Sequence, residues 1–292
     1  MAFLDNLING VSLGSIYAII ALGYTMVYGI AKMLNFAHGD VIMVGAYIAY
    51  VGMQMWGLPA PLAIVISMAV CTVLGITIEG LAYRPLRRAA SLAVLITAIG
   101  MSYLLQNLAL MIWGANSRVY PETFINSTTI RLGELTISIS AVITIVVSAV
   151  IMIGLTLFTN RTRMGKAMRC VSEDRGAAEL MGINVNRTIS VTFAIGSALA
   201  AIAGVLLCST YPVLQPTTGS MPGIKAFTAA VFGGIGSIPG AMLGGVLLGV
   251  IEIFGKAYIS TELGDAIVFV VLIIVLLVRP TGLLGKPVRE KV

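Results

Sequence analysis

Long runs of apolar residues without a charged side chain dominate the pattern along this chain. Most of them reach the roughly 20 helical residues needed to cross a hydrocarbon core of about 30 Å. The runs are Leu7–Ile30, Val41–Ile78 (with room for two helices), Ser91–Trp113, Thr136–Asn160, Thr188–Gln215 and the shorter Ala266–Val278. Runs of this length predict an all-α protein, a polytopic bundle of membrane helices that forms a single transmembrane domain over residues 1–292.

The composition agrees with this pattern. Hydrophobic residues make up 58% of the chain, charged residues only 10%, and the mean hydropathy is +1.00, whereas about a quarter of the residues of a soluble domain are charged. The lipid bilayer is therefore the expected environment. We interpret the isoelectric point near 9.3 as the result of cations kept on the cytoplasmic side, and we expect no nucleic-acid partner.

The distribution of lysine and arginine predicts the orientation. Segments 79–90, 160–187 and 279–292, together with Lys32, hold fourteen of the 18 cations. Cytoplasmic loops are the ones enriched in Lys and Arg, so these segments belong inside. This places the C-terminus inside and the N-terminus outside. The remaining cations fall in segments that the topology places outside; they are Arg118, Arg131, Lys225 and Lys256.

The stretch 226–259 is too long for one span and is interrupted by Gly233-Gly-Ile-Gly-Ser-Ile-Pro-Gly240. We predict a short helix at 225–234, a Gly/Pro turn, a full span at 241–258 and a last span at 265–279. The total is then about 8–9 membrane segments, one of them short or broken. A broken helix at membrane depth is tolerated only where protein buries it or where it lines a cavity. Gly233–Gly240 is therefore either an element of a transport pathway or an ordinary tight turn at the cytoplasmic face.

Small residues recur at helical spacing in several of the runs. Gly240 with Gly244, Gly245 with Gly249, and the stretch 196–204 all follow this pattern. Close backbone contact through small residues holds helices together in lipid. The spacing predicts a tightly packed bundle, with contact to a homologous partner subunit as a second use of the same motif.

Few ionisable residues lie within the apolar runs, and each is a candidate for function. Glu252 and Lys256 are four residues apart near the outer end of their span, which favours an interfacial ion pair. Glu79 is interpreted as a boundary residue beside the arginines at 84–88. Between the first two spans, His38 and Asp40 favour a polar knot in which Asp40 caps the next helix, over proton coupling or metal binding. The chain has a single histidine, so no metal site is expected.

A polar, basic loop from Asn160 to Arg187 interrupts this apolar chain, and its segment Ser172–Asn184 has the pattern of a short amphipathic helix. A polar helix on the cytoplasmic side would contact a soluble partner. The sequence contains no Gly-x-x-x-x-Gly-Lys-Ser/Thr phosphate loop. It also lacks the ladder of buried ionisable residues that proton-driven transporters usually show. We therefore expect a chain that is not an enzyme and holds no cofactor, with energy for transport entering from another subunit through loop 160–187.

Several blocks of this sequence are similar to blocks of one known family. They are Tyr17–Gly29, Asn35–Gly39, Ala82–Arg87, Arg161–Arg169, Ala177–Asn184, Ala203–Leu206, Lys225–Gly240 and Arg279–Gly285. Taken in order and nearly end to end, they resemble the permeases of branched-chain amino-acid ABC transporters, namely the H-type subunit of the leucine/isoleucine/valine importer. Residues 114–135 are the least similar stretch.

The resemblance implies a multi-pass subunit of the bacterial inner membrane. Its implied partners are a second related permease, two cytoplasmic ATPases that bind the ATP, and a periplasmic binding protein that selects the amino acid. Segment 173–182 looks like the family's coupling motif, a helix of about ten residues and roughly 15 Å that contacts an ATPase, with a glycine suited to a left-handed helix end. The coupling residues are Glu173, Arg175, Ala177, Ala178, Glu179, Leu180, Met181 and Gly182.

The solute pathway is less marked in the sequence. The groups that could meet the zwitterionic end of an amino acid are Asn35, Thr228, Gly233, Gly234, Gly236 and Ser237. A permease for urea or amides remains an alternative within the same class. A secondary carrier or channel that works without nucleotide is the alternative from another class. Such a carrier predicts inverted sequence halves and ion ligands near the midplane, and neither is found in this sequence.

Overall fold

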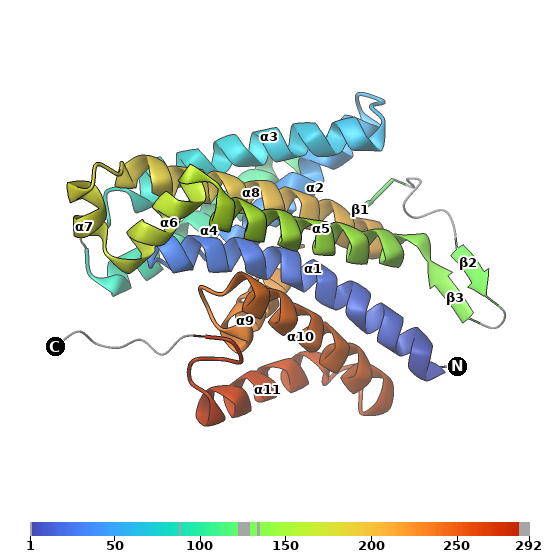
Figure 1. Ribbon diagram of the computed structural model, residues 1–292. Helices are drawn as coiled ribbons and strands as arrows, with labels where there is room; N and C mark the ends of the chain where they lie inside the picture. Colours follow the sequence, from blue (N-terminus) through green and yellow to red (C-terminus); the bar gives the residue numbers. More distant parts are fainter. Residues whose placement is uncertain (1, 88, 122–128, 133–134, 286–292) are drawn as a thin grey trace.

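The computed structural model describes residues 2–87, 89–121, 129–132 and 135–285. Arg88, the basic tail 286–292 and most of segment 122–135 therefore lie outside the described residues. The helices are α1 (Ala2–Ala31), α2 (His38–Gln54), α3 (Ala60–Ile78) with a π-helical continuation η1 (Glu79–Tyr83), α4 (Ser91–Trp113), α5 (Ile139–Arg161), α6 (Arg163–Glu173), α7 (Arg175–Leu180), α8 (Val185–Thr210), α9 (Ser220–Gly233), α10 (Ile238–Tyr258) and α11 (Gly264–Val278). Figure 1 shows them as one elongated bundle.

The predicted helical membrane protein is confirmed. Among the described residues, 6 helices are long and apolar enough to cross a bilayer: α1, α3 with η1, α4, α5, α8 and α10. Of the shorter helices, α11 (15 residues) is apolar, and α2 and α9 have 17 and 14 residues. The described part of the chain thus has six candidate spans and one shorter apolar helix, and the predicted total of 8–9 segments stays a prediction. The short helix of the 226–259 region is α9, which begins before the predicted start at 225.

Helix α1 lies at the centre of the bundle. In its most apolar window 94% of the residues are buried, whereas the corresponding windows of α4 and α5 are only 17% and 22% buried. Helix α1 packs against α8, α9 and α10 (Figure 1). The most buried span is thus the first one, and α4 and α5 present apolar side chains outward, as helices that face lipid or another subunit do.

Glycines set the spacing between α1 and α10. A Cβ added to Gly249 would lie 2.2 Å from the Cα of Gly14, and a Cβ added to Gly245 would lie 2.5 Å from the Cα of Ala18. Gly244 similarly approaches the carbonyl oxygen of Ala229 on α9. The prediction of close packing through small residues is confirmed. These small residues of α10 form contacts within the chain, since they face α1 and α9 rather than a surface open to another subunit.

Two small antiparallel sheets interrupt the predicted all-α fold. Strand β1 (Arg118–Val119) pairs with β4 (Val213–Leu214), and β2 (Thr129–Leu132) pairs with β3 (Leu135–Ser138). The hairpin takes the first residues of the predicted span 136–160, so α5 begins at Ile139. The hairpin and the start of α1 lie at one end of the bundle and α7 at the other (Figure 1). We call the end that carries α6, α7 and residues 279–285 the basic end.

The interruption at 233–240 is a tight turn at the basic end. Gly234 and Gly236 have φ values of 105° and 95°, which favour glycine, and the Ser237 side chain accepts a hydrogen bond from the Gly240 amide to cap α10. The amides of Leu283 and Leu284 donate to the carbonyls of residues 232 and 233. The C-terminal segment therefore closes over this turn, which favours the turn over a broken helix at membrane depth.

Candidate functional site

The polar island at 160–187 folds into two helices rather than one. Helix α6 ends at Glu173, and α7 begins at Arg175 and has 6 residues. Asp174 separates them: its backbone is extended, and its carboxylate accepts a hydrogen bond of 3.0 Å from the Ala177 amide, which caps α7. The predicted helix of about ten residues is therefore wrong. An aspartate with extended backbone ends one helix and starts the next, so α7 is a rod of only about 9 Å.

The end of α7 has the predicted left-handed glycine. Gly182 has a φ of 79°. Its amide donates to the carbonyl of Glu179, and the Ile183 amide donates to the carbonyl of Ala178, at 2.9 and 3.0 Å. This pair of bonds defines a Schellman motif, which satisfies the last carbonyls of a helix. The chain then turns directly into α8, whose first turn is capped by the Asn184 side chain.

The exposed apolar surface at the end of α7 is formed by Ala177, Leu180 and the following Met181, which we call the α7 tip. Leu180 and Met181 are 91% and 82% exposed, although both are large apolar residues. Ala178 is only 3% exposed and packs toward the bundle. Of the residues predicted for coupling, Ala178 therefore does not belong to the outer surface of α7. With one turn of α7 packed on α6 and α8, only its outer side remains free. Figure 1 shows α7 at the extremity of the basic end.

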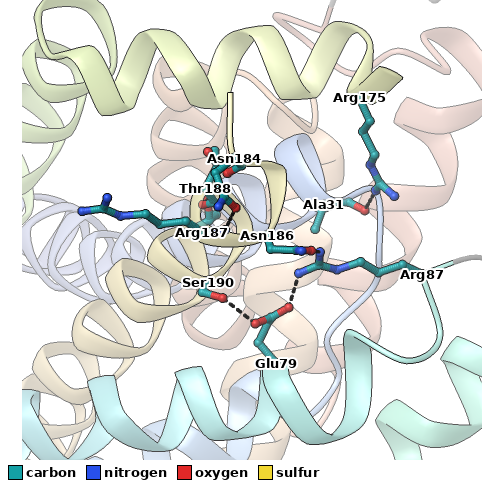
Figure 2. A network of polar contacts seen from close by, with 10 residues as sticks. Ala31, Glu79, Arg87, Arg175, Asn184, Asn186, Arg187, Thr188 and Ser190 are labelled. Carbon is teal, nitrogen blue, oxygen red and sulfur yellow. Dashed lines mark hydrogen bonds and ion pairs between the residues drawn. The ribbon is translucent and has the colours of Figure 1, made fainter. Parts of the chain in front are cut away.

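Arg175 turns inward from α7 and does not flank the α7 tip. Its guanidinium donates to the carbonyl of Ala31, the last residue of α1 (Figure 2). Such a bond satisfies a carbonyl at a helix C-terminus, where positive charge is favoured. Burial and, to a smaller extent, the neighbouring Arg87 lower the pKa of Arg175. Of the charged residues predicted for coupling, Arg175 is thus turned away from the α7 tip, whereas Glu173 and Glu179 are exposed.

A network around Glu79 connects the spans next to α7. Glu79 is buried at the start of η1, where it pairs with Arg87 and accepts a hydrogen bond of 2.6 Å from Ser190 on α8. Arg87 also donates to Asn186 in the first turn of α8 (Figure 2). The expected place of Glu79 beside the arginine cluster is confirmed by the pair with Arg87, and Glu79 also joins α3 and η1 to α8. Its position at the membrane boundary stays a prediction. The network therefore holds η1 against the first turns of α8.

The candidate pathway residues are occupied by contacts within the chain. The Asn35 side chain accepts a hydrogen bond of 2.9 Å from the Tyr83 hydroxyl, and Thr228 donates to the carbonyl of Ile224 in its own helix. Gly233 and Gly234 are buried beneath residues 282–285, and Ser237 is the cap of α10. Gly236 borders a cavity of about 70 Å³ next to α1 and α6. The role of these residues in solute passage stays a prediction.

A buried charge cluster was missed by the sequence analysis. Glu252 is 1% exposed and accepts hydrogen bonds from Lys225 on α9 at 2.8 Å, from Lys256 at 2.5 Å and from the Tyr17 hydroxyl of α1 at 2.8 Å. Lys225 also pairs with Asp265 of α11 at 2.6 Å. The expected Glu252–Lys256 pair exists, but its acid is buried, because α1 and α9 also contribute partners to the Glu252 carboxylate. The position of the pair at the membrane interface stays a prediction. The signal in the sequence was Lys225, a cation within the apolar pattern of α9.

The polar knot between α1 and α2 also differs from its prediction. The N-cap of α2 is Ala37, without a side-chain bond, so Asp40 is not the cap. Its carboxylate instead accepts a hydrogen bond of 2.8 Å from Gln106 on α4. His38 is buried, with its ring edge-on to Tyr24 at 4.7 Å between centroids. Asp40 thereby ties α4 to the bundle, because a buried carboxylate is stable there only when hydrogen-bonded.

Comparison with known proteins gives a consistent result. The sequence model of a family described as "Branched-chain amino acid transport system / permease component" matches residues 6–276. The chain is 48% identical to the high-affinity branched-chain amino acid transport system permease protein BraD of Pseudomonas aeruginosa, over 99% of this chain and 98% of the relative. Identity to LivH, the protein with the same description from Escherichia coli, is 46% over the same shares.

Two more distant similarities are informative. The autoinducer 2 import system permease protein LsrD of Salmonella paratyphi B is 27% identical, over 93% of this chain and 82% of the relative. Among solved structures, PsaBC from Streptococcus pneumoniae in complex with Fab superposes with a TM-score of 0.50 and 14% identity, over 94% of this chain and 91% of that chain. The structural likeness concerns the fold alone.

Proposed function

Because the chain belongs to the family of branched-chain amino acid transport permeases, we propose that it is the membrane-spanning subunit of an ATP-driven importer for leucine, isoleucine and valine. The observation that carries the proposal is identity close to one half along nearly the whole length of both chains, rather than at one motif. The apolar helices of the bundle are consistent with a multi-pass membrane protein.

The proposed assembly has five parts. Two cytoplasmic ATPases supply ATP hydrolysis, a second related permease completes the membrane portion, and a periplasmic binding protein delivers the amino acid. This chain lies in the bacterial inner membrane with its basic end inside. The charge distribution supports that orientation, since loop 160–187 and residues 279–285 lie at the same end of the bundle, as the enrichment of Lys and Arg in cytoplasmic loops requires.

The α7 tip is the proposed contact with an ATPase. Two large apolar side chains that are almost fully exposed at a polar end of the protein are typical of a surface that a partner covers. The hydrogen bond of Arg175 to α1 and the connection of Gly182 to α8 would carry a displacement of α7 into the spans. Alternating access would follow as a rigid-body movement of the bundle.

Reconstituted uptake tests this proposal. Liposomes that contain this chain with the second permease and the ATPases, ATP in the lumen facing the basic end, and the binding protein outside should accumulate radiolabelled leucine. Unlabelled isoleucine and valine should compete, whereas urea, acetamide and autoinducer 2 should not. Competition by urea or acetamide alone would favour the amide-permease alternative.

The same preparation separates an importer subunit from a carrier. Liposomes that hold only this chain, without nucleotide, should show no accumulation of leucine against its gradient. Accumulation under a proton or sodium gradient would contradict the importer proposal and favour a secondary carrier, since a carrier draws its energy from the coupled ion rather than from another subunit.

A further inference from the structure

A cavity of about 390 Å³ lies at the basic end between the end of α1 and the start of α4, and the proposed transport cycle does not use it. Three cationic side chains line it, from three different segments: Lys32 after α1, Arg87 after η1 and Arg175 of α7. Its other wall is apolar and includes Val94 and Leu95 of α4. A cavity that combines converging cations with an apolar wall suits a ligand that has an anionic group and an apolar portion.

The positive charge in this cavity is only partly balanced. Arg87 is paired with Glu79. Arg175 donates to the carbonyl of Ala31, which occupies only part of a guanidinium with five N–H donors. Among the described residues, neither Lys32 nor Arg175 has a carboxylate within ion-pair distance. The cavity therefore holds two cations for which the described part of the chain supplies no counter-charge.

The backbone at Lys32 gives an independent indication. Its φ of 53° is the only positive value at a non-glycine position in the described part of the chain. This left-handed conformation at the end of a helix favours glycine and costs a side-chain-bearing residue free energy. A lysine here places an ammonium group at the cavity in spite of that cost, and unfavourable backbone geometry of this kind is concentrated at functional sites.

The cavity lies beside apolar surface. Leu81 on η1 and Leu92 and Ile96 on α4 are 74%, 65% and 60% exposed, as side chains that face hydrocarbon are. The cations lie at the end of these segments, which in the proposed orientation is the end beside the headgroups of the cytoplasmic leaflet. Basic pockets between membrane helices on that side bind anionic headgroups.

We propose that this cavity binds the phosphate group of an anionic phospholipid, with Lys32 and Arg175 as its ligands and Val94 and Leu95 against the glycerol and acyl portion. The lipid supplies the missing counter-charge. Because Arg175 is the first residue of α7, an occupied site also holds α7 against the end of α1. The site is independent of which solute the protein transports, so failure of the importer proposal would leave it standing.

Lipid retention measures this site directly. The chain, with the subunits that co-purify, is extracted into a mild detergent with equal amounts of phosphatidylglycerol and phosphatidylcholine, and bound lipid is counted by native mass spectrometry. We expect retained phosphatidylglycerol in preference to phosphatidylcholine. Lys32→Gly and Arg175→Gln should each weaken that retention about fivefold, the effect of one cation near an anionic lipid.

The variants have matched controls. Lys166→Gln and Arg163→Gln remove exposed cations of the same types from α6 and should retain phosphatidylglycerol as the wild type does. Lys32→Gly keeps the fold intact because glycine adopts the observed φ without strain, so loss of lipid in this variant reports the charge. Equal retention of both lipids, or equal loss in the α6 controls, would overturn the proposal.

Competition distinguishes the source of the anion. Inorganic phosphate or leucine added in excess should leave phosphatidylglycerol bound, because neither of them fills both the cationic part and the apolar part of the cavity as a phospholipid does. Displacement of the lipid by inorganic phosphate would assign the site to a free anion. Displacement by leucine would assign it to the transported solute. Either result would overturn the lipid proposal.

Discussion

One carboxylate deep inside this bundle is held by three hydrogen-bonding side chains. It belongs to Glu252, and two lysines and a tyrosine from α9, α10 and α1 surround it. A buried carboxylate without partners would cost several kcal/mol. The cluster therefore fixes how three helices meet, and this role depends on every member being present.

Removing the acid at the centre of this cluster should destabilise the protein. We expect Glu252→Ala to lower the free energy of unfolding by about 3–5 kcal/mol, because Lys225 loses a buried partner. Thermal unfolding in detergent measures the change. Glu262→Ala, at an exposed position between α10 and α11, serves as the control. A similar unfolding temperature for wild type and Glu252→Ala would show that the cluster contributes nothing to stability.

Exposure decides which residue of α7 is suited to a test of coupling. Leu180→Asp changes a side chain that is 91% exposed, so the protein should still fold and reach the membrane. Loss of an apolar anchor at an interface commonly costs 2 kcal/mol or more. We therefore expect ATP-driven leucine uptake to fall at least about tenfold. The uptake assay in liposomes measures this, with membrane content determined by immunoblot.

Two further variants make that test specific. Leu284→Asp alters another exposed leucine at the basic end and should transport normally. Ala178→Asp would instead bury a carboxylate in the packed side of α7, since Ala178 is 3% exposed, and should reduce the amount of folded protein. Normal uptake by Leu180→Asp would remove the α7 tip from the proposed ATPase contact.

At the scale of elements, glycine positions determine how closely helices approach. Helices α1 and α10 meet backbone to backbone where Gly14 faces Gly249. In lipid, such contacts replace the hydrophobic driving force that holds helices together in water. Glycines on the outward faces of α4 and α5 have no such neighbour: around Gly100 and Gly154 an added Cβ would meet nothing within 4 Å.

This contrast gives a matched pair of variants. Gly249→Ala should destabilise the protein by about 1–3 kcal/mol, because its methyl group would overlap the backbone of α1. Gly154→Ala should be neutral or stabilise by up to about 1 kcal/mol, since alanine is the better helix former. Unfolding temperatures in the same detergent measure both. Equal temperatures for the two variants would contradict the close contact of α1 with α10.

At the scale of the whole molecule, the structure shows which segments lie at the same end (Figure 1), and we propose from the distribution of Lys and Arg that the basic end faces the cytoplasm. Native cysteines suit a test of this orientation. Cys170 is exposed on α6 at the basic end, whereas Cys71 and Cys208 are buried. Val119 on β1, at the opposite end, is 77% exposed.

We expect a membrane-impermeant maleimide to label Cys170 in inside-out vesicles and not in right-side-out vesicles. A Val119→Cys variant in a Cys170→Ser background should show the reverse. Gel-shift or mass analysis of the labelled chain gives the readout. Labelling of Cys170 from the outside and of position 119 from the inside would show that the orientation is inverted.

Regular spacing in the sequence was enough to predict the apolar spans, the capping glycine of α7 and the small-residue ridges. Each of these follows from local physics: a helix length against a bilayer thickness, a positive φ at a helix end, a missing side chain at a helix contact. The resemblance of ordered blocks further indicated the family that the comparisons confirmed.

The tertiary structure alone decided which way the side chains of those helices point. In the sequence, Glu252 and Lys256 are four residues apart, which is the spacing of a surface ion pair. The Glu252 carboxylate is enclosed only because α9 and α1 pack against it. Likewise Ala178 and Leu180 are both apolar, yet packing of α7 on its neighbours buries the smaller one and leaves the larger one exposed. Composition and periodicity predict where a helix forms. Which of its side chains are buried depends on segments from distant parts of the chain that pack against it, and a local sequence pattern contains no information on those contacts.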